Sequence, residues 1–235
     1  MPKNFTATKE DLLKLLDELI AEKSAKWWTR FYSDPNRKCP FFTANADENL
    51  FELVEKNELC APVKVLDIGC GNGRNSIFLA KRGFDVEAVD FSETAIAQAK
   101  ENAAKAGVSV KFHCRSIFDF EYAAKSFDAI YDSGCFHHIA PHRRPDFLAL
   151  VANALKTGGI FAMVCFAPGG GSDFSDLEVY QNQTMGGGLS FTEESLRKIF
   201  SNDFQNIEIR QMKEFPETEN LFGKDFLWTV KMERK

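Results

Sequence analysis

The stretch VLDIGCGNGRNSIFLA, residues 65–80, most constrains how this chain folds. A short apolar run leads to three alternating glycines, Gly69, Gly71 and Gly73, and then to a helical apolar pattern. Glycines lack a Cβ atom, so they permit a tight turn and a close approach of a ligand to the backbone. In open α/β sheets, ligands lie beyond the carboxyl ends of the strands. The pattern therefore predicts a strand, a ligand-binding turn and a helix, and not a plain strand-to-helix connection.

Strand and helix patterns alternate after residue 63, which predicts an α/β fold with a parallel sheet covered by helices on both faces. Strands are expected at 63–69, 85–90, 108–114, 127–133 and 160–167. Helices are expected at 74–83, at 92–107 between a Ser92 N-cap and Gly107, at 144–159 up to two glycines, and at 192–201 behind a Thr192 N-cap. The last two strands, 206–215 and 225–235, are expected to pair as an antiparallel hairpin at the sheet edge.

Residues 1–61 differ from this pattern and are interpreted as an N-terminal helical arm on the α/β domain of residues 62–235. Leucine and isoleucine spacing predicts helix within 9–32, and 48–59 is expected as a helix stopped by Pro62. The proline-containing segment 33–49 is expected as an irregular connection. Residues 167–190 hold two glycine triplets and are expected as a loop, either a second lid with glycine hinges or a disordered insertion.

Composition excludes several classes of protein. A formal net charge of -5 disfavours a nucleic-acid scanner, which needs a basic surface. Six cysteines show no C-x-x-C or zinc spacing, so free thiols and no metal are expected. The N-terminus has no uninterrupted apolar run, and the longest one, residues 160–167, is too short for a bilayer. We expect a cytoplasmic protein, monomeric or homodimeric, with no membrane partner.

The side chains around the glycines indicate which ligand binds. A dinucleotide motif has a third glycine at its sixth position, where this chain has Arg74. Asp67, just before the turn, would repel a pyrophosphate but suits a cationic amine near a sulfonium. Asp90 ends the next strand, where a carboxylate accepts hydrogen bonds from both ribose hydroxyls. The combination predicts a nucleoside with a positively charged tail and disfavours a nicotinamide oxidoreductase.

The motifs VLDIGCGNGRNSIFLA, VEAVDFS, FDAIYDSGCFHHI and LKTGGIFAMV together resemble class I S-adenosylmethionine-dependent methyltransferases, over about residues 63–166. GCGNGRNS is similar to the tellurite-resistance and thiopurine branches, and HHI to the ubiquinone-biosynthesis type. The resemblance implies a Rossmann-like sheet of seven strands, the last antiparallel, that binds S-adenosylmethionine and releases S-adenosylhomocysteine.

The resemblance also implies roles for residues along the strand ends. It places the methionine portion of the cofactor near Asp67, Gly69, Cys70 and Gly71, the ribose at Asp90, and the adenine at Phe91, Ser116 and Ile117. Asp119 is the alternative to Ser116, where the family often has an acidic residue. Asp132, at the end of the fourth strand, is expected either to contact cofactor or substrate, or to cap its loop.

The segment after the fourth strand is expected to line the methyl-transfer side. His137 and His138 are candidates for a general base, or are structural; a metal role together with His142 is disfavoured by the spacing. Cys135 is either a reactive thiol or a packing residue. Arg143 and Arg144 are expected to hold an acidic substrate or to form a solvated helix start.

Aromatic residues in the N-terminal arm suggest that the arm covers the methyl-transfer side of the site. Trp28 and Tyr32 are expected to line the acceptor pocket, alongside a plain packing role, and Tyr180 is expected to reach it from the insertion. The leading hypothesis is a methyltransferase acting on a small molecule: a thiol, a chalcogen species, or a hydroxylated or aromatic metabolite. The alternatives are a nucleic-acid or protein methyltransferase and a non-catalytic S-adenosylmethionine-binding regulatory protein.

Overall fold

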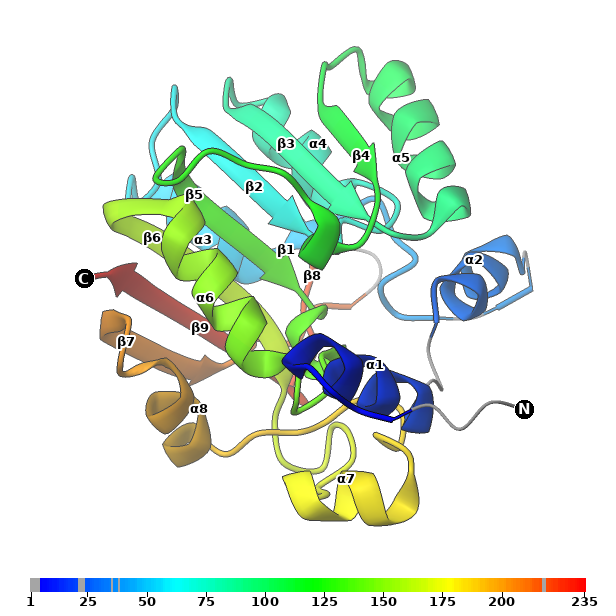
Figure 1. Cartoon of the computed structure of the whole chain (residues 1–235). Coiled ribbons are helices and arrows are strands. Elements are labelled where there is room, and N and C mark those ends of the chain that lie inside the picture. The colour runs from blue at the N-terminus through cyan, green and yellow to red at the C-terminus, as the bar shows by residue number, and fades with distance from the viewer. Residues whose placement is uncertain (1–4, 21–23, 35, 38, 217–218) are drawn as a thin grey trace.

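A seven-stranded sheet with the strand order β4-β3-β2-β5-β6-β9-β7 organises the computed structural model, which describes residues 5–20, 24–34, 36–37, 39–216 and 219–235 (Figure 1). The pairs from β4 to β6 are parallel, and β9 runs antiparallel to both of its neighbours. The last strand therefore enters the sheet between β6 and β7, which confirms the predicted fold class and the predicted hairpin.

The strands of the main sheet are β2 (Lys64–Ile68), β3 (Asp85–Asp90), β4 (Lys111–Cys114), β5 (Phe127–Ser133), β6 (Leu155–Phe166), β7 (Phe204–Gln211) and β9 (Leu227–Arg234). The helices are α1 (Lys9–Leu19), α2 (Ala25–Ser33), α3 (Glu48–Glu55), α4 (Arg74–Ala80), α5 (Glu93–Ala106), α6 (Arg144–Ala154), α7 (Asp176–Asn182) and α8 (Glu193–Phe200), with 3-10 turns η2 (Ile117–Asp119) and η3 (Phe136–His138). Two short strands, β1 (Ala46–Asp47) and β8 (Leu221–Phe222), pair in parallel.

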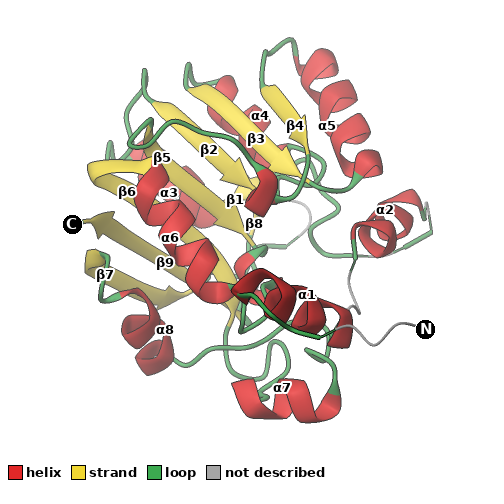
Figure 2. Cartoon of the chain, in the orientation of Figure 1, coloured by secondary structure: helices red, strands yellow, loops and turns green. Residues whose placement is uncertain are grey.

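Helices cover both faces of the sheet, with α6 in front and α3 and α4 behind in the view of Figure 2. Alternate residues of a strand point to opposite faces. On β5, Ile130 belongs to the core beneath α6 and α8, whereas Ala129 and Tyr131 belong to the core beneath α3 and α4. This two-sided burial explains why the central strands read as nearly continuous apolar runs.

Local signals located several elements correctly. β3 and β5 have the predicted bounds. The hydroxyl of Ser92 accepts a hydrogen bond from the amide of Ala95, and Gly107 ends α5 in the left-handed conformation, as predicted. The hydroxyl of Thr192 caps α8 in the same way.

The predicted helix at 144–159 is wrong in its second part. α6 ends at Ala154, and Leu155 already pairs with Phe127 as the first residue of β6. The register then shifts, and a Cβ atom on Gly159 would lie 2.9 Å from one backbone carbonyl oxygen and 3.0 Å from another. The glycines therefore belong to an irregularity in the strand and do not terminate the helix.

The N-terminal segment also differs from its prediction. α1 and α2 are separate helices, and residues 21–23, which the predicted helix at 9–32 included, lie outside the described part, as does Pro35 in the predicted connection. That connection contains β1, and α3 ends at Glu55, well before Pro62. The pairing of β1 with β8 joins segments far apart in the sequence, so local patterns could not indicate it.

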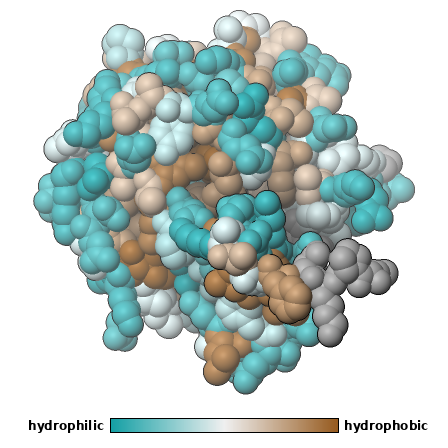
Figure 3. Space-filling view, in the orientation of Figure 1, coloured by the Kyte–Doolittle hydropathy of each residue, from teal (hydrophilic) through white to brown (hydrophobic). Residues whose placement is uncertain are grey.

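The glycine-rich insertion is ordered around a helix that its composition did not indicate. The hydroxyl of Ser175 caps α7, and the side chain of Glu178 completes a reciprocal capping box. Isolated bridges from Phe166 to Ser190 and from Ser172 to Leu189 close the base of the insertion. Apolar surface is visible around α1 and α7 (Figure 3). The exposed large apolar side chains include Phe5, Leu15 and Leu177. No helix within the described ranges has the length and apolar character needed to cross a bilayer.

Candidate functional site

A cavity of about 980 Å³ opens at the carboxyl ends of the parallel strands. Its walls come from the turn after β2, the ends of β3 and β4, the loop after β5, and the N-terminal helices. Of the predicted site residues it is lined by Trp28, Tyr32, Asp67, Gly69, Cys70, Gly71, Asp90, Phe91, Ser116, Ile117, Cys135, His137 and His138. Residues predicted separately from sequence thus meet around one space.

The turn after β2 favours glycine at the two positions where it approaches neighbouring segments most closely. Gly69 and Gly71 have φ angles of +65° and +55°, in the left-handed region that side chains disfavour. A Cβ atom on Gly69 would lie 2.7 Å from the Cβ atom of Cys135, and one on Gly71 would lie 2.6 Å from the hydroxyl of Tyr32. The turn is therefore enclosed by the β5 loop on one side and by α2 on the other.

Asp67 is a buried carboxylate at the carboxyl end of β2. Its Oδ2 accepts a hydrogen bond of 2.5 Å from the Ser76 hydroxyl on α4. Burial raises the pKa of Asp67 to about 7, against the Ser76 hydrogen bond and the charge of Arg74, which both lower it. A cationic group arriving in the cavity would favour the ionised form of this carboxylate.

Asp90 ends β3 and is oriented by the backbone. Oδ2 accepts a hydrogen bond of 3.0 Å from the amide of Gly71, and Oδ1 accepts one of 2.8 Å from the amide of Ser92. Burial raises the pKa of Asp90, while the backbone hydrogen bonds lower it. Because each oxygen has a further lone pair, the carboxylate can still accept from two ligand hydroxyls while it braces the glycine turn.

The end of β4 forms the next wall of the cavity. The hydroxyl of Ser116 accepts a hydrogen bond of 3.2 Å from the amide of Phe118 and caps η2, which begins at the buried Ile117. Phe91 and Asp119 also line the cavity here. This arrangement leaves both Ser116 and Asp119 facing the space where the resemblance places the adenine.

Two histidines and several aromatic rings also line the cavity. The Nε2 atoms of His137 and His138 lie 3.1 Å apart in a hydrogen bond. His137 stacks on Phe166 with ring centroids 3.9 Å apart, and His138 meets the edge of Trp28 at 5.0 Å. The histidine pair is thus held between strand β6 and helix α2 and faces the cavity.

Cys135 sits beside the glycine turn. Burial raises the pKa of its thiol well above the usual value, which keeps the thiol neutral. Its close contact with Gly69 supports the packing interpretation over that of a reactive thiol. Among the described residues, no group of three His, Cys, Asp or Glu side chains is arranged to hold a metal ion.

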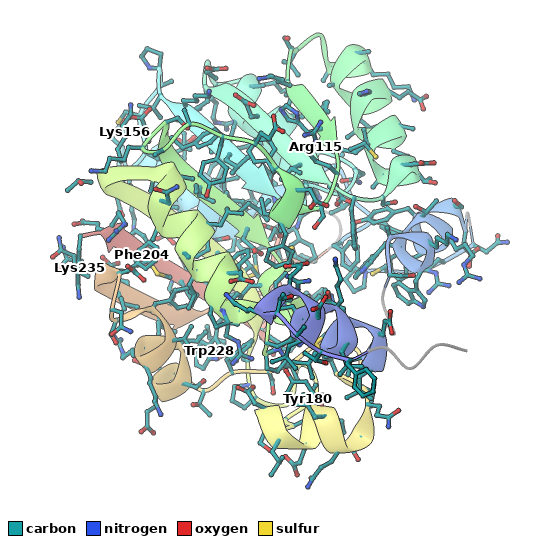
Figure 4. All side chains as sticks on the ribbon, viewed as in Figure 1. Arg115, Lys156, Tyr180, Phe204, Trp228 and Lys235 are labelled. Carbon is teal, nitrogen blue, oxygen red and sulfur yellow. The ribbon has the colours of Figure 1, made fainter. Side chains whose placement is uncertain are left out.

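Asp132 and Tyr180 are not among the residues that line the cavity. For Asp132 the structure shows the second of the two expected roles, the loop cap, and Tyr180 does not reach the pocket that it was expected to line. Oδ1 of the buried Asp132 accepts hydrogen bonds from the amides of Cys135 and Phe136, at 2.8 and 3.3 Å, so it caps the loop. Tyr180 belongs to α7 (Figure 4), and its hydroxyl lies 3.1 Å from Nδ1 of His142 in a hydrogen bond. Both positions depend on how loops pack, which spacing along the chain does not specify.

The polar side chains of residues 142–144, where α6 begins, are bonded to other parts of the protein and are not only solvated. Arg143 pairs with Asp17 of α1 at 2.5 Å, and the Nε2 atom of His142 lies 2.9 Å from the same carboxylate. Arg144 forms two hydrogen bonds with Asp176 of α7, at 3.0 and 3.1 Å. The start of α6 therefore holds both α1 and the insertion helix α7 in place. Helix α1 reaches the cavity through Asp17.

Sequence reasoning missed a buried polar network behind the glycine turn. Arg74 pairs at 2.6 Å with Asp47, a carboxylate with 0% exposure. The hydroxyl of Tyr131 donates to Oδ2 of Asp47 at 2.6 Å, and the amide of Asn75 donates to the same atom at 2.9 Å. The only sequence signal was an arginine at the sixth position of the glycine motif, which gave no indication of its partner.

Comparison with known proteins gives a consistent result. Residues 65–159 match a family described as a methyltransferase domain. The probable S-adenosyl-L-methionine-dependent methyltransferase TehB of Haemophilus influenzae is 29% identical over 110 residues, which cover 46% of this chain and 37% of TehB. The chain spans less than half the length of the first curated relatives that it matches.

Solved structures share the fold. A structure from work on the conversion of a disulfide bond into a thioacetal group during echinomycin biosynthesis has a TM-score of 0.70 at 21% identity, covering 90% of this chain and 93% of that one. Phosphoethanolamine N-methyltransferase 2 of Haemonchus contortus, bound to phosphomonomethylethanolamine and S-adenosylhomocysteine, has a TM-score of 0.62 at 17% identity, covering 98% and 61% of the two chains.

Proposed function

Because the chain belongs to the class I S-adenosylmethionine-dependent methyltransferase superfamily, we propose that it transfers a methyl group from S-adenosylmethionine to a small-molecule acceptor. One observation carries the proposal: the glycine turn, two buried carboxylates and a histidine pair line the same cavity. The acceptor is a thiol, a chalcogen species, or a hydroxylated or aromatic metabolite that fits against the rings of that cavity.

The residues present fit this cofactor. The backbone of Gly69 and Gly71 leaves room that a Cβ atom would fill, and Asp90 offers oriented oxygens to the ribose. Ser116 and Ile117 face the expected position of the adenine, while Asp67 offers a carboxylate to the amine of the tail. When bound, S-adenosylmethionine supplies an electrophilic methyl group on a sulfonium centre.

The histidine pair performs the proton chemistry where the acceptor carries a proton. Since the two Nε2 atoms share one hydrogen bond, one ring donates through Nε2 while the other accepts, which fixes complementary tautomers. A proton taken from the acceptor can then be held by either ring of the pair. A positioned base contributes about 10²–10⁴-fold to such a reaction.

Helix α2 closes the site and excludes water. The hydroxyl of Ser33 bonds Thr94 at 3.0 Å, and the side chain of Gln98 donates to the backbone oxygen of Tyr32 at 3.0 Å, so α2 is attached to α5. Trp28 and Tyr32 then place aromatic surface over the turn and the histidines. Aromatic faces attract a sulfonium through its positive charge. We infer that residues 1–61 act as a lid.

Two measurements test the proposal. Calorimetric titration should show binding of S-adenosylmethionine and S-adenosylhomocysteine and not of NAD; binding of NAD alone would contradict the assignment. A radiolabelled methyl-transfer screen over pooled thiols, phenols, amines and nucleic acid should label a small-molecule pool. Label in nucleic acid instead would assign the acceptor to that class, and cofactor binding with no transfer to any pool would indicate a non-catalytic protein.

A further inference from the structure

The second glycine triplet of the insertion, residues 186–188, is a sequence feature to which the proposed function gives no role. Its last member, Gly188, is buried and has a φ angle of +136°, which side chains disfavour. The amide of Ser172 donates to the backbone oxygen of Gly188 at 2.8 Å, and the amide of Leu189 donates to the backbone oxygen of His137 at 2.8 Å. The backbone around Gly188 is therefore bonded both to the start of the insertion and to the histidine pair.

Gly188 faces the rings of the histidine pair with no room for a side chain between them. A Cβ atom on Gly188 would lie 2.9 Å from Cε1 of His138 and 3.1 Å from Cδ2 of His137. It would also lie 2.8 Å from Cε2 of Phe166, the ring on which His137 stacks. Carbon atoms in van der Waals contact are about 3.5–4.0 Å apart, so a methyl group on Gly188 would displace these rings.

These close approaches lie beside the nitrogen atom through which His137 bonds His138. In an imidazole ring, Nε2 is flanked by Cδ2 and Cε1. Gly188 lies against Cδ2 of His137, and a Cβ atom on Gly134 would lie 3.3 Å from Cε1 of the same ring. Phe166 covers one face of the ring at an interplanar angle of 13°. Packing on two edges and one face thus sets the direction in which His137 Nε2 points.

The approach to the imidazoles is specific to Gly188 among the glycines of the insertion, all of which the structure describes. An added Cβ atom on Gly169, which also has a positive φ, +78°, would have nothing within 4 Å. One on Gly186 would lie 2.8 Å from Cβ of Ser172, away from the histidines. The need for glycine at position 188 therefore comes from the rings that it faces.

We propose that Gly188 and Phe166 are positioning residues for methyl transfer, which hold His137 and His138 in the geometry in which their Nε2 atoms share one hydrogen bond. The inference rests on the proposed function, in which this pair takes a proton from the acceptor. Gly188 is not among the residues that line the cavity, so it acts through the rings and not on a ligand. Because a displacement of about 1 Å can slow a reaction about a hundredfold, this support affects catalysis.

NMR of the imidazole rings measures the geometry of the pair directly. The chain has four histidines, so long-range proton–nitrogen correlation spectra of the rings are simple, and single substitutions assign them. In the wild-type protein, one ring of the pair should carry its proton on Nε2 and the other on Nδ1. In Gly188→Ala, both rings should shift toward averaged tautomers. Gly169→Ala adds the same methyl group at a positive φ in open space and should keep the wild-type signals.

Methyl transfer and cofactor binding complete the test. Gly188→Ala should lower the initial rate of labelling of the pool that the wild-type protein methylates by about tenfold or more, and should keep S-adenosylhomocysteine affinity within about twofold. Gly169→Ala should keep both. Wild-type imidazole signals in folded Gly188→Ala, or equal losses of rate in the two variants, would overturn the assignment.

Thermal unfolding shows whether each variant folds, since both place a side chain at a positive φ. If Gly188→Ala does not fold, Phe166→Leu is measured in the same way, because it removes the stacking ring without straining the insertion backbone. It should shift the signals of His137, and unchanged signals would overturn the assignment. If the wild-type protein labels no pool, the proposed function fails, whereas the imidazole spectra still decide whether Gly188 positions the pair.

Discussion

The phenolic oxygen of Tyr32 lies 2.6 Å from the point where a Cβ atom on Gly71 would stand. The arm and the glycine turn therefore touch with no space for a side chain between them. Burial raises the pKa of Tyr32 well above its usual value, so the group at this contact is a neutral phenol. Helix α2 of the N-terminal arm and the glycine turn thus line the cavity side by side.

Gly71→Ala should separate these two elements. The new methyl group meets the Tyr32 hydroxyl, and we expect cofactor affinity to fall at least about tenfold in calorimetry because the lid contact and the turn both shift. Gly107→Ala is the matched control, since Gly107 also has a positive φ, +67°, but has nothing within 4 Å of the added atom. It should lower the free energy of unfolding by about 1 kcal/mol and leave affinity unchanged. Equal effects of the two variants on affinity would refute the contact.

The histidine pair should affect turnover more than cofactor binding. His137→Ala and His138→Ala are each expected to slow methyl transfer by about 10²–10⁴-fold, because the shared hydrogen bond and the base are lost. Rates are measured at saturating cofactor with the acceptor that the screen identifies, and S-adenosylhomocysteine affinity is measured in parallel. His113→Ala, which removes a histidine paired with Glu87 away from the cavity, is the control. Full activity in both test variants would assign the pair a structural role.

Buried carboxylates should make the ligand-free protein less stable as the pH rises. Burial raises the pKa values of Asp67 and Asp132 to about 7, above about 3.9 in an unfolded chain. Between about pH 4 and 7 the folded state holds the extra protons, so the free energy of unfolding falls by about 1.4 kcal/mol per pH unit for each group.

Urea unfolding at pH 4.5, 5.5 and 6.5 measures this slope. Asp132→Asn should reduce the slope of the free energy of unfolding against pH by the contribution of one proton, because an amide cannot ionise. The amide oxygen of the new side chain can still accept hydrogen bonds from the backbone amides of the loop. Asp225→Asn, at an exposed position, should leave the slope unchanged. An unchanged slope in Asp132→Asn would show that Asp132 is ionised in the folded protein across this range.

Asp17 should control how firmly α1 is attached. Its carboxylate binds Arg143 and His142, and Asp17→Asn removes the charge from both contacts. We expect faster amide hydrogen exchange across residues 9–19 and a higher KM for the acceptor with little change in cofactor affinity. Lys14→Gln, which removes an exposed pair with Glu10 on the same helix, is the control. Unaltered exchange in Asp17→Asn would show that the Asp17 contacts do not hold α1 in place.

The sequence by itself determined those parts of the protein that depend on nearby residues. Short stretches of the chain carry the signals for strands buried on both faces, for the caps at Ser92 and Gly107, and for the glycine turn. These signals were enough to predict the fold class and the positions of Asp67 and Asp90 at strand ends. The family resemblance added roles for the same positions. At these positions the local signals and the structure agree.

Only the tertiary structure decided the contacts between distant segments. Local helical periodicity near Ala154 gave way to pairing of Leu155 with Phe127. The partnership of Asp47 with Arg74 and the removal of Asp132 from the cavity wall likewise depend on residues brought together by the sheet. Burial, charge pairing and strand register depend on what folds against a residue, and no window of sequence contains that information.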